Sequence, residues 1–76
     1  MKELVEFLAM ELVDEPDEVR VTESADDRGV LITVNVAPED MGKVIGRGGR
    51  TAKAIRAVVR AAAARQGLDV RVDIAD

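Results

Sequence analysis

The sequence contains no cysteine and no histidine, and each absence excludes a kind of chemistry. Without cysteine the chain forms no disulfide and offers no thiolate as a nucleophile or metal ligand. Without histidine it lacks the commonest metal ligand and the side chain that most often serves as a general base near neutral pH. We therefore expect a protein that is not an enzyme and that holds no metal and no cofactor.

Aromatic side chains are almost as scarce, since Phe7 is the only one among 76 residues. Many modules that bind single-stranded nucleic acids stack bases on several aromatic rings, and this chain cannot do so. Its apolar residues make up 47% of the sequence and are mainly Val, Leu, Ile and Ala. That is enough for one small hydrophobic core, and we predict one domain over residues 1–76.

Long hydrophobic runs are also missing. A helix that spans a bilayer needs about 20 consecutive apolar residues, and no segment approaches this length. Met1 leads directly into charged residues, unlike the start of a secretory signal peptide. The sequence therefore predicts a cytoplasmic protein without a membrane partner.

The basic residues are concentrated in one part of an acidic chain. The formal net charge is −4, but residues 41–68 carry seven Lys and Arg, and all 15 acidic residues lie outside this segment. A wholly basic segment in an acidic protein indicates a surface that meets an anionic partner. A solvated helix surface with a chance imbalance of charge is the alternative.

The spacing of apolar residues predicts an α+β fold. We expect the first two strands to pair as an antiparallel hairpin, and the third to lie parallel to a neighbour after a right-handed crossover. The helices would then pack on one face of a three-stranded mixed sheet. The expected elements are a helix over residues 2–13, a strand over 19–23, a polar hairpin loop over 24–29, a strand over 30–36, a short helix from 38 to 46, a longer helix from about 50 to 66, and a strand over 70–74.

The faces of the two longer helices follow from 3.6 residues per turn. Phe7 and Met10 fall on the acidic side of the first helix, where they either pack at the edge of the core or form a partner surface. The expected core face of the helix over residues 50–66 consists of Ile55, Val58, Val59 and Ala62. The basic side of that helix, roughly 120° wide, consists of Arg50, Lys53, Arg56 and Arg60.

Three glycines in four positions separate the two helices of the basic segment, as Gly46, Arg47, Gly48 and Gly49. A glycine within a helix costs roughly 1 kcal/mol relative to alanine, so this tetrapeptide predicts a break. The next helix begins with unpaired amides, the positive end of its dipole and cationic side chains, which together attract an anion. Because glycines let a ligand approach those amides, the segment predicts a phosphate-binding corner.

Two common nucleotide-binding loops do not fit this segment. The P-loop requires G-x-x-x-x-G-K-[ST] after a strand, whereas here a predicted helix precedes the glycines and no lysine stands at the required place. The dinucleotide fingerprint G-x-G-x-x-G also fails, because Thr51 occupies the sixth position of GRGGRT. The remaining interpretation is the backbone of a polyanion that follows the loop and one face of the next helix.

The stretch VIGRGG resembles the KH motif V-I-G-x-x-G, in which a G-x-x-G loop joins two helices and clamps about four nucleotides of backbone. The predicted order of elements resembles the type II KH topology. Residues 38–60, PEDMGKVIGRGGRTAKAIRAVVR, are similar to the small single-domain bacterial KH proteins of the KhpA family, and the resemblance covers essentially the whole chain. It implies a single KH domain over residues 1–76 with its loop at residues 46–49.

The resemblance also implies which residues bind single-stranded RNA. The loop would hold the sugar–phosphate backbone, the end of the preceding helix would lie beside the groove, and three flanking cations would reach phosphates. Residues 24–29 correspond to the variable loop, which would form the other rim of the groove. The implied binding residues are Lys43, Val44, Ile45, Gly46, Arg47, Gly48, Gly49, Arg50 and Lys53.

Members of the KhpA family form homodimers and pair with a larger KH protein, KhpB or Jag, and the resemblance implies these partners here. It further implies an RNA chaperone or post-transcriptional regulator linked to cell shape and cell wall organisation. The alternative is a protein-interaction adaptor, in which contact with RNA is secondary.

Overall fold

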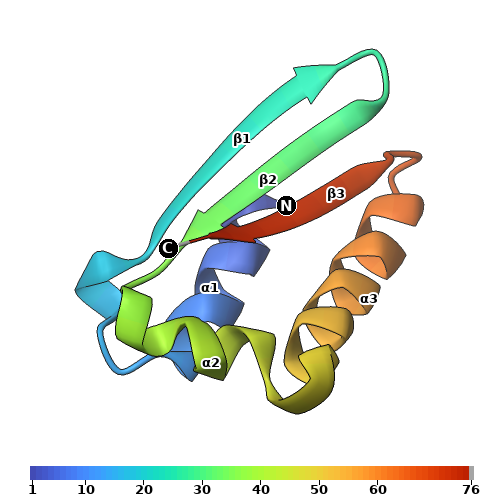
Figure 1. Ribbon diagram of the computed structural model, residues 1–76. Coiled ribbons are helices and arrows are strands. Elements are labelled where there is room, and N and C mark those ends of the chain that lie inside the picture. Colours follow the sequence, from blue (N-terminus) through green and yellow to red (C-terminus); the bar gives the residue numbers. More distant parts are fainter. Residues whose placement is uncertain (76) are drawn as a thin grey trace.

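A three-stranded sheet and three α-helices form two layers (Figure 1). The computed structural model describes residues 1–75. It confirms the predicted order of helices and strands, and it adds single 3-10 turns at Pro16–Glu18, Pro38–Asp40 and Arg47–Gly49. No helix in the described range is both long and apolar enough to cross a bilayer. The main elements are α1 (Lys2–Leu12), β1 (Arg20–Asp26), β2 (Gly29–Asn35), α2 (Met41–Ile45), α3 (Arg50–Ala64) and β3 (Val70–Ala75).

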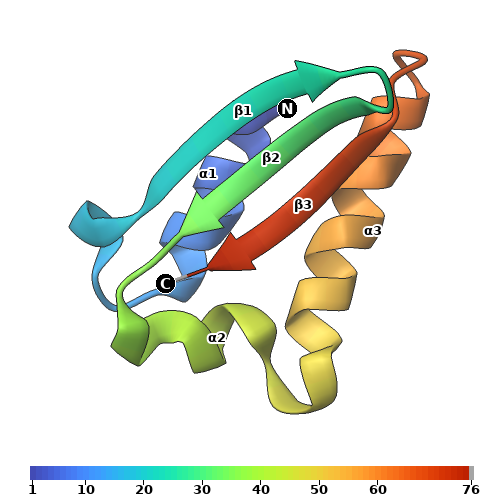
Figure 2. The ribbon, with the colours of Figure 1, turned by 45° about the horizontal axis from the view of Figure 1, so that its top comes forward.

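The central strand β2 pairs with both neighbours, antiparallel with β1 and parallel with β3. Its residues alternate as the sequence predicts, so that Ile32 and Val34 are buried and face the helices. Helices α1 and α3 cover one face of the sheet, and α2 lies at the end where β2 and β3 terminate (Figure 2). These observations confirm an α+β fold with a three-stranded mixed sheet and its helices on one face.

The buried side of α3 differs in part from the prediction. Val58 is 49% exposed, and Ala62 is only half-buried. The helix is turned so that Arg56 reaches β3, where its Nε donates to the carbonyl oxygen of Val72 at 3.0 Å. Small side chains then complete the face that packs on the sheet. The buried residues of α3 are Ala52, Ile55, Val59 and Ala63.

The predicted antiparallel hairpin is confirmed, but the predicted loop over residues 24–29 is too long. Strand β1 continues to Asp26, and only Asp27 and Arg28 form the turn. The Arg28 amide donates to Asp26 Oδ1 at 2.8 Å, and Arg71 Nη2 donates to Asp26 Oδ2 at 3.0 Å. These hydrogen bonds, chiefly that from the Arg28 amide, lower the pKa of Asp26 from its ordinary value. Apolar alternation is missing at this end of β1 because the end is exposed to solvent, so the strand could not be predicted this far.

The outer side of α1 carries two large apolar side chains. Phe7 is 59% exposed and Met10 is 43% exposed. The alternative that they pack at the edge of the core is therefore wrong, and a partner surface remains the interpretation for both.

One buried carboxylate joins the start of the α2 segment to the connection that follows α1. Asp40 is 1% exposed. Its Oδ1 accepts from the Asp14 amide at 3.2 Å, and its Oδ2 accepts from the Glu15 amide at 3.0 Å. Because these bonds link residues 25 and 26 positions apart, Asp40 fixes where α2 begins relative to α1.

We expect Asp40→Ala to destabilise the fold. The substitution leaves the Asp14 and Glu15 amides without their acceptor, and the loss of charged hydrogen bonds costs roughly 2–3 kcal/mol in the free energy of unfolding. Urea denaturation measures the change. Glu39→Ala, an exposed position in the same 3-10 turn, is the matched control. Equal losses in the two variants would show that the buried carboxylate contributes nothing of its own.

Candidate nucleic-acid interface

The segment between α2 and α3 is a turn that only glycine adopts easily. Gly46, Gly48 and Gly49 have φ values of 79°, 66° and 78°. These lie in the left-handed region, which disfavours residues with a Cβ atom. The helical pattern is therefore interrupted here, as the sequence predicts.

The hydrogen bonds of this turn leave two amides free. The Gly49 amide donates to the Gly46 carbonyl oxygen at 3.1 Å, and the Arg50 amide donates to the Arg47 carbonyl oxygen. The amides of Arg47 and Gly48 donate to no acceptor within residues 1–75. Both residues are exposed. An anion at the tip of the turn would therefore meet two unpaired N–H groups.

Gly46 has a further reason to be glycine. A Cβ atom at this position would lie 2.8 Å from the Thr51 amide nitrogen and closer still to the Thr51 hydroxyl. Gly48 and Gly49 have open space where a Cβ atom would stand. The start of α3 therefore packs directly against the Gly46 backbone, whereas the other two glycines are selected by their φ angles alone.

Three predicted cations surround the turn and point into solvent. Arg47 lies in the turn, Arg50 begins α3, and Lys53 follows one turn later on the same side of the helix. None of the three forms an ion pair with a carboxylate among the described residues. Their positive charge is therefore available to a ligand at the tip.

Lys43 is placed differently from the other cations. Its Nζ lies 3.5 Å from Asp14 Oδ2, in the connection that follows α1. Both side chains are largely exposed, and an exposed ion pair of this kind contributes little stability. Lys43 can thus exchange Asp14 for a phosphate at small cost.

The two apolar residues at the end of α2 differ in burial. Val44 is 1% exposed and belongs to the core cluster. Ile45 is half-buried. Val44 is thus the residue at this end of α2 that the core encloses fully. Ile45, next to Gly46, is the side chain that keeps surface beside the turn.

The β1–β2 hairpin does not form a second rim for the glycine turn. Next to the hairpin turn, the Val30 amide donates to the Asp69 carbonyl oxygen at 2.9 Å. Asp69 follows the C-terminal end of α3, so the hairpin turn lies near that end of the helix. A helix of 15 residues is about 22 Å long, so the hairpin and the glycine turn lie at opposite ends of α3. The predicted role of residues 24–29 as the variable-loop rim is wrong for this reason. The segment beside α2 is instead the α1–β1 connection, which Asp40 and Lys43 contact.

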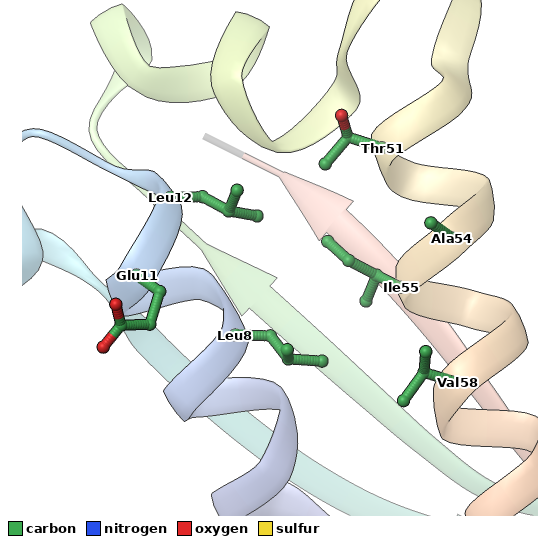
Figure 3. A pocket seen from close by; sticks show the side chains of 7 residues that line it. All are labelled: Leu8, Glu11, Leu12, Thr51, Ala54, Ile55 and Val58. Atoms are coloured by element: carbon green, nitrogen blue, oxygen red, sulfur yellow. The ribbon is translucent and has the colours of Figure 1, made fainter.

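An apolar groove lies between α1 and α3 (Figure 3). It is on the side of α3 away from the basic residues. Its volume is about 240 Å³, and Glu11 is its only titratable lining residue. The lining therefore offers no pair of groups for acid–base chemistry, and it favours an apolar occupant. The lining residues are Leu8, Glu11, Leu12, Thr51, Ala54, Ile55 and Val58.

The KH signature extends over almost the whole chain. A family model described as "KhpA/KhpB, KH domain" matches residues 2–74. This chain belongs to the KhpA/KhpB KH-domain family. The membership also confirms the expectation of a non-enzymatic protein, because the relatives are named for binding RNA.

Several relatives match over nearly their full length. An RNA-binding protein KhpA from Halalkalibacterium halodurans is 59% identical over all of both chains. The KhpA of Clostridium perfringens is 53% identical over 97% of this chain and 99% of the relative. The KhpA of Mycobacterium tuberculosis is 50% identical over 95% of this chain and 86% of the relative.

Two solved structures share the fold. A point variant of Aquifex aeolicus Era bound to GDP and AlF4⁻ has a TM-score of 0.63 at 22% identity, over 96% of this chain and 28% of that protein. Era in complex with a segment of 16S ribosomal RNA has a TM-score of 0.59 at 21% identity, over 97% of this chain and 28% of that protein. The type II KH topology predicted from the sequence is thus confirmed.

We expect Gly46→Ala to destabilise the protein for two reasons. Alanine would have to adopt a positive φ, and its Cβ atom would clash with Thr51. Strain of this kind costs roughly 1–3 kcal/mol in the free energy of unfolding. Gly42→Ala is the control, since Gly42 lies in α2 with open space around it, and alanine there is neutral or stabilises by up to about 1 kcal/mol. Thermal or urea denaturation of the two variants measures the contrast, and a Gly46→Ala variant as stable as Gly42→Ala would contradict the packing described.

Proposed function

We propose that this protein is a non-catalytic binder of single-stranded RNA that grips the sugar–phosphate backbone with the turn at residues 46–49. The observation that carries the proposal is the pair of free amides at Arg47 and Gly48, on an exposed turn flanked by unpaired cations. The names of the relatives, RNA-binding protein KhpA, support the same function.

The proposed roles follow from the geometry. Arg47 and Gly48 offer their amides to a phosphate, and the Arg47 guanidinium adds a charged contact. Arg50 and Lys53 meet the next phosphates along α3, and Lys43 joins them when it leaves Asp14. The remaining residues shape the turn and hold it in place, namely Val44, Ile45, Gly46 and Gly49.

The glycine turn by itself would bind RNA weakly and with little dependence on sequence. It covers only a few nucleotides, and the chain has no set of aromatic rings for stacking. Phosphate contacts make the affinity fall with rising salt, with a slope of roughly 0.7 per contact for single strands. An RNA chaperone or post-transcriptional regulator in the cytoplasm, with effects on cell shape and cell wall organisation, suits this mode of binding.

Self-association would compensate for weak binding, because two linked sites raise avidity by about 10² or more. We propose a homodimer formed through the groove between α1 and α3. Val58 and Leu12 line this groove and are 49% and 37% exposed, and Phe7 adds exposed apolar surface on α1. A two-fold arrangement that sets the groove of one copy against the groove of the second would bury these exposed apolar side chains on both copies.

A larger KH protein of the KhpB or Jag type is the other proposed partner. The family model that matches this chain is described by both names, KhpA and KhpB. A KH domain of the same fold would present a comparable surface to the groove, so it competes with a second copy for the same place.

Replacement of Arg47 and Gly48 together by aspartate tests RNA binding. Two negative charges beside the free amides should lower the affinity for a single-stranded oligonucleotide at least about tenfold and reduce the salt slope by roughly one phosphate contact. Fluorescence anisotropy over a salt series measures both quantities, and circular dichroism checks the fold.

The matched control is Arg65→Asp with Gly67→Asp. It changes the net charge equally and also places an aspartate at a glycine of positive φ, 70°, with open space around it, but at the other end of α3. If both double variants bind RNA as the original chain does, RNA contact is incidental and the adaptor function is favoured.

Val58→Asp tests the dimer. A charge in the centre of the groove should shift the molar mass to that of a monomer while the fold survives, because Val58 is already half exposed. Ala57→Asp, the exposed neighbour on the other side of α3, should remain dimeric. Light scattering after size exclusion gives the mass, and a dimeric Val58→Asp protein would rule out this surface.

A further inference from the structure

Arg56 differs from every other basic side chain on α3. Arg50, Lys53 and Arg60 are exposed, whereas Arg56 is half-buried and donates from Nε to the Val72 carbonyl oxygen at 3.0 Å. All four lie on the side of α3 opposite the apolar groove. One guanidinium is thus held against the sheet within a row of exposed cations.

The strand that holds Arg56 is an open edge. In the order β1-β2-β3, the outer side of β3 has no partner strand (Figure 2). The carbonyl oxygens of Asp69 and Ala75 accept from the amides of Val30 in β2 and of Val36 just after it. The backbone groups of the alternate residues Val72 and Ile74 therefore point to the open side. Arg56 therefore occupies the middle of this edge and covers the Val72 carbonyl oxygen.

The bond to Val72 uses only one of the five guanidinium donors. The four N–H groups of Nη1 and Nη2 donate to no acceptor within residues 1–75. The two terminal nitrogens of the planar guanidinium form a fork whose N–H groups match two adjacent acceptor atoms. Because the bond to Val72 already fixes this fork, it loses little conformational entropy when it binds. Lys53 and Arg60, about one turn to either side, are exposed and supply further positive charge for phosphates.

We infer that Arg56 reads a base, and that it selects bases that present two adjacent acceptors. In RNA these are guanine, through O6 and N7, and cytosine, through O2 and N3. Each acceptor of adenine and uracil that could meet the fork is flanked by a donor or by carbon. The inference rests on the proposed function, because it requires RNA held by the glycine turn.

The position of Arg56 suits the nucleotides next to those held by the turn. Arg56 lies seven residues after Gly49, which is about 10 Å along the helix axis. A strand that leaves the turn along the basic side of α3 therefore passes between Lys53 and Arg60 and reaches the open edge of β3. Phosphates would face the exposed cations, and one base would face the fixed fork.

Four hexanucleotides test the inference: uridine alone, and uridine alternating with guanosine, cytidine or adenosine. We expect the guanosine or cytidine oligonucleotide to bind about tenfold more tightly than the adenosine and uridine ones. Arg56→Lys keeps the charge and a donor for Val72 but removes the fork. It should abolish this preference while the affinity for oligouridine and the salt slope stay unchanged.

Arg60→Lys is the matched control, because it makes the same replacement at the exposed position one turn away, and it should keep the preference. Arg56→Gln is the second variant in case the lysine disturbs the edge, and it should also lose the preference. A comparison of the affinities for the guanosine and the cytidine oligonucleotide shows which of the two bases Arg56 reads. An unchanged preference in both Arg56 variants would overturn the inference. A uniform loss of affinity for all four oligonucleotides in Arg56→Lys, which keeps the charge, would also overturn it.

These outcomes are distinct from failure of the proposed function. If the original chain binds none of the four oligonucleotides in a salt-dependent way, the turn is not an RNA site, and both proposals fall. If it binds all four equally and the variants at Arg47 and Gly48 abolish binding, the proposed function stands and base reading by Arg56 fails.

Discussion

The parallel pairing of β2 with β3 is the constraint on which the rest of the structure depends. Two parallel strands need a crossover connection, and here α2, the glycine turn and α3 provide it. Because α3 must pack back on the sheet to bury Val59 against Ile32 and Val70, its N-terminus and the turn before it are held at one end of the sheet. The glycine turn at residues 46–49 is thus exposed by the same connection that closes the core.

Helix α3 has three different sides, one packed on the sheet, one cationic and one apolar toward the groove. Alanines at 52 and 63 let it lie close to the sheet, and exposed cations line the side near β3. Val58 and Ala54 face the groove toward α1. Residues 41–68 contain no acidic side chain that would repel the proposed RNA on the side near β3.

Most of the fold could be predicted because its signals are local. Strict alternation in β2, proline and glycine at helix ends, and the glycine tetrapeptide each act over a few residues. The end of β1 could not be predicted in this way, because an exposed edge strand does not need apolar alternation. The exposure of Val58 also escaped prediction, because the helical period gives two adjacent faces that the sequence does not distinguish.

The sequence by itself determined the order of elements, the break at residues 46–49 and the gathering of basic residues around it, because backbone preference and charge are properties of short segments. Only the tertiary structure decided which cations are free. Arg56 is bound to Val72, 16 positions away, and Lys43 is drawn to Asp14 across the connection after α1. It also decided that Asp40 anchors α2 to residues 25 and 26 positions away. Such contacts depend on how helices and sheet pack together, and no local pattern in the chain encodes them.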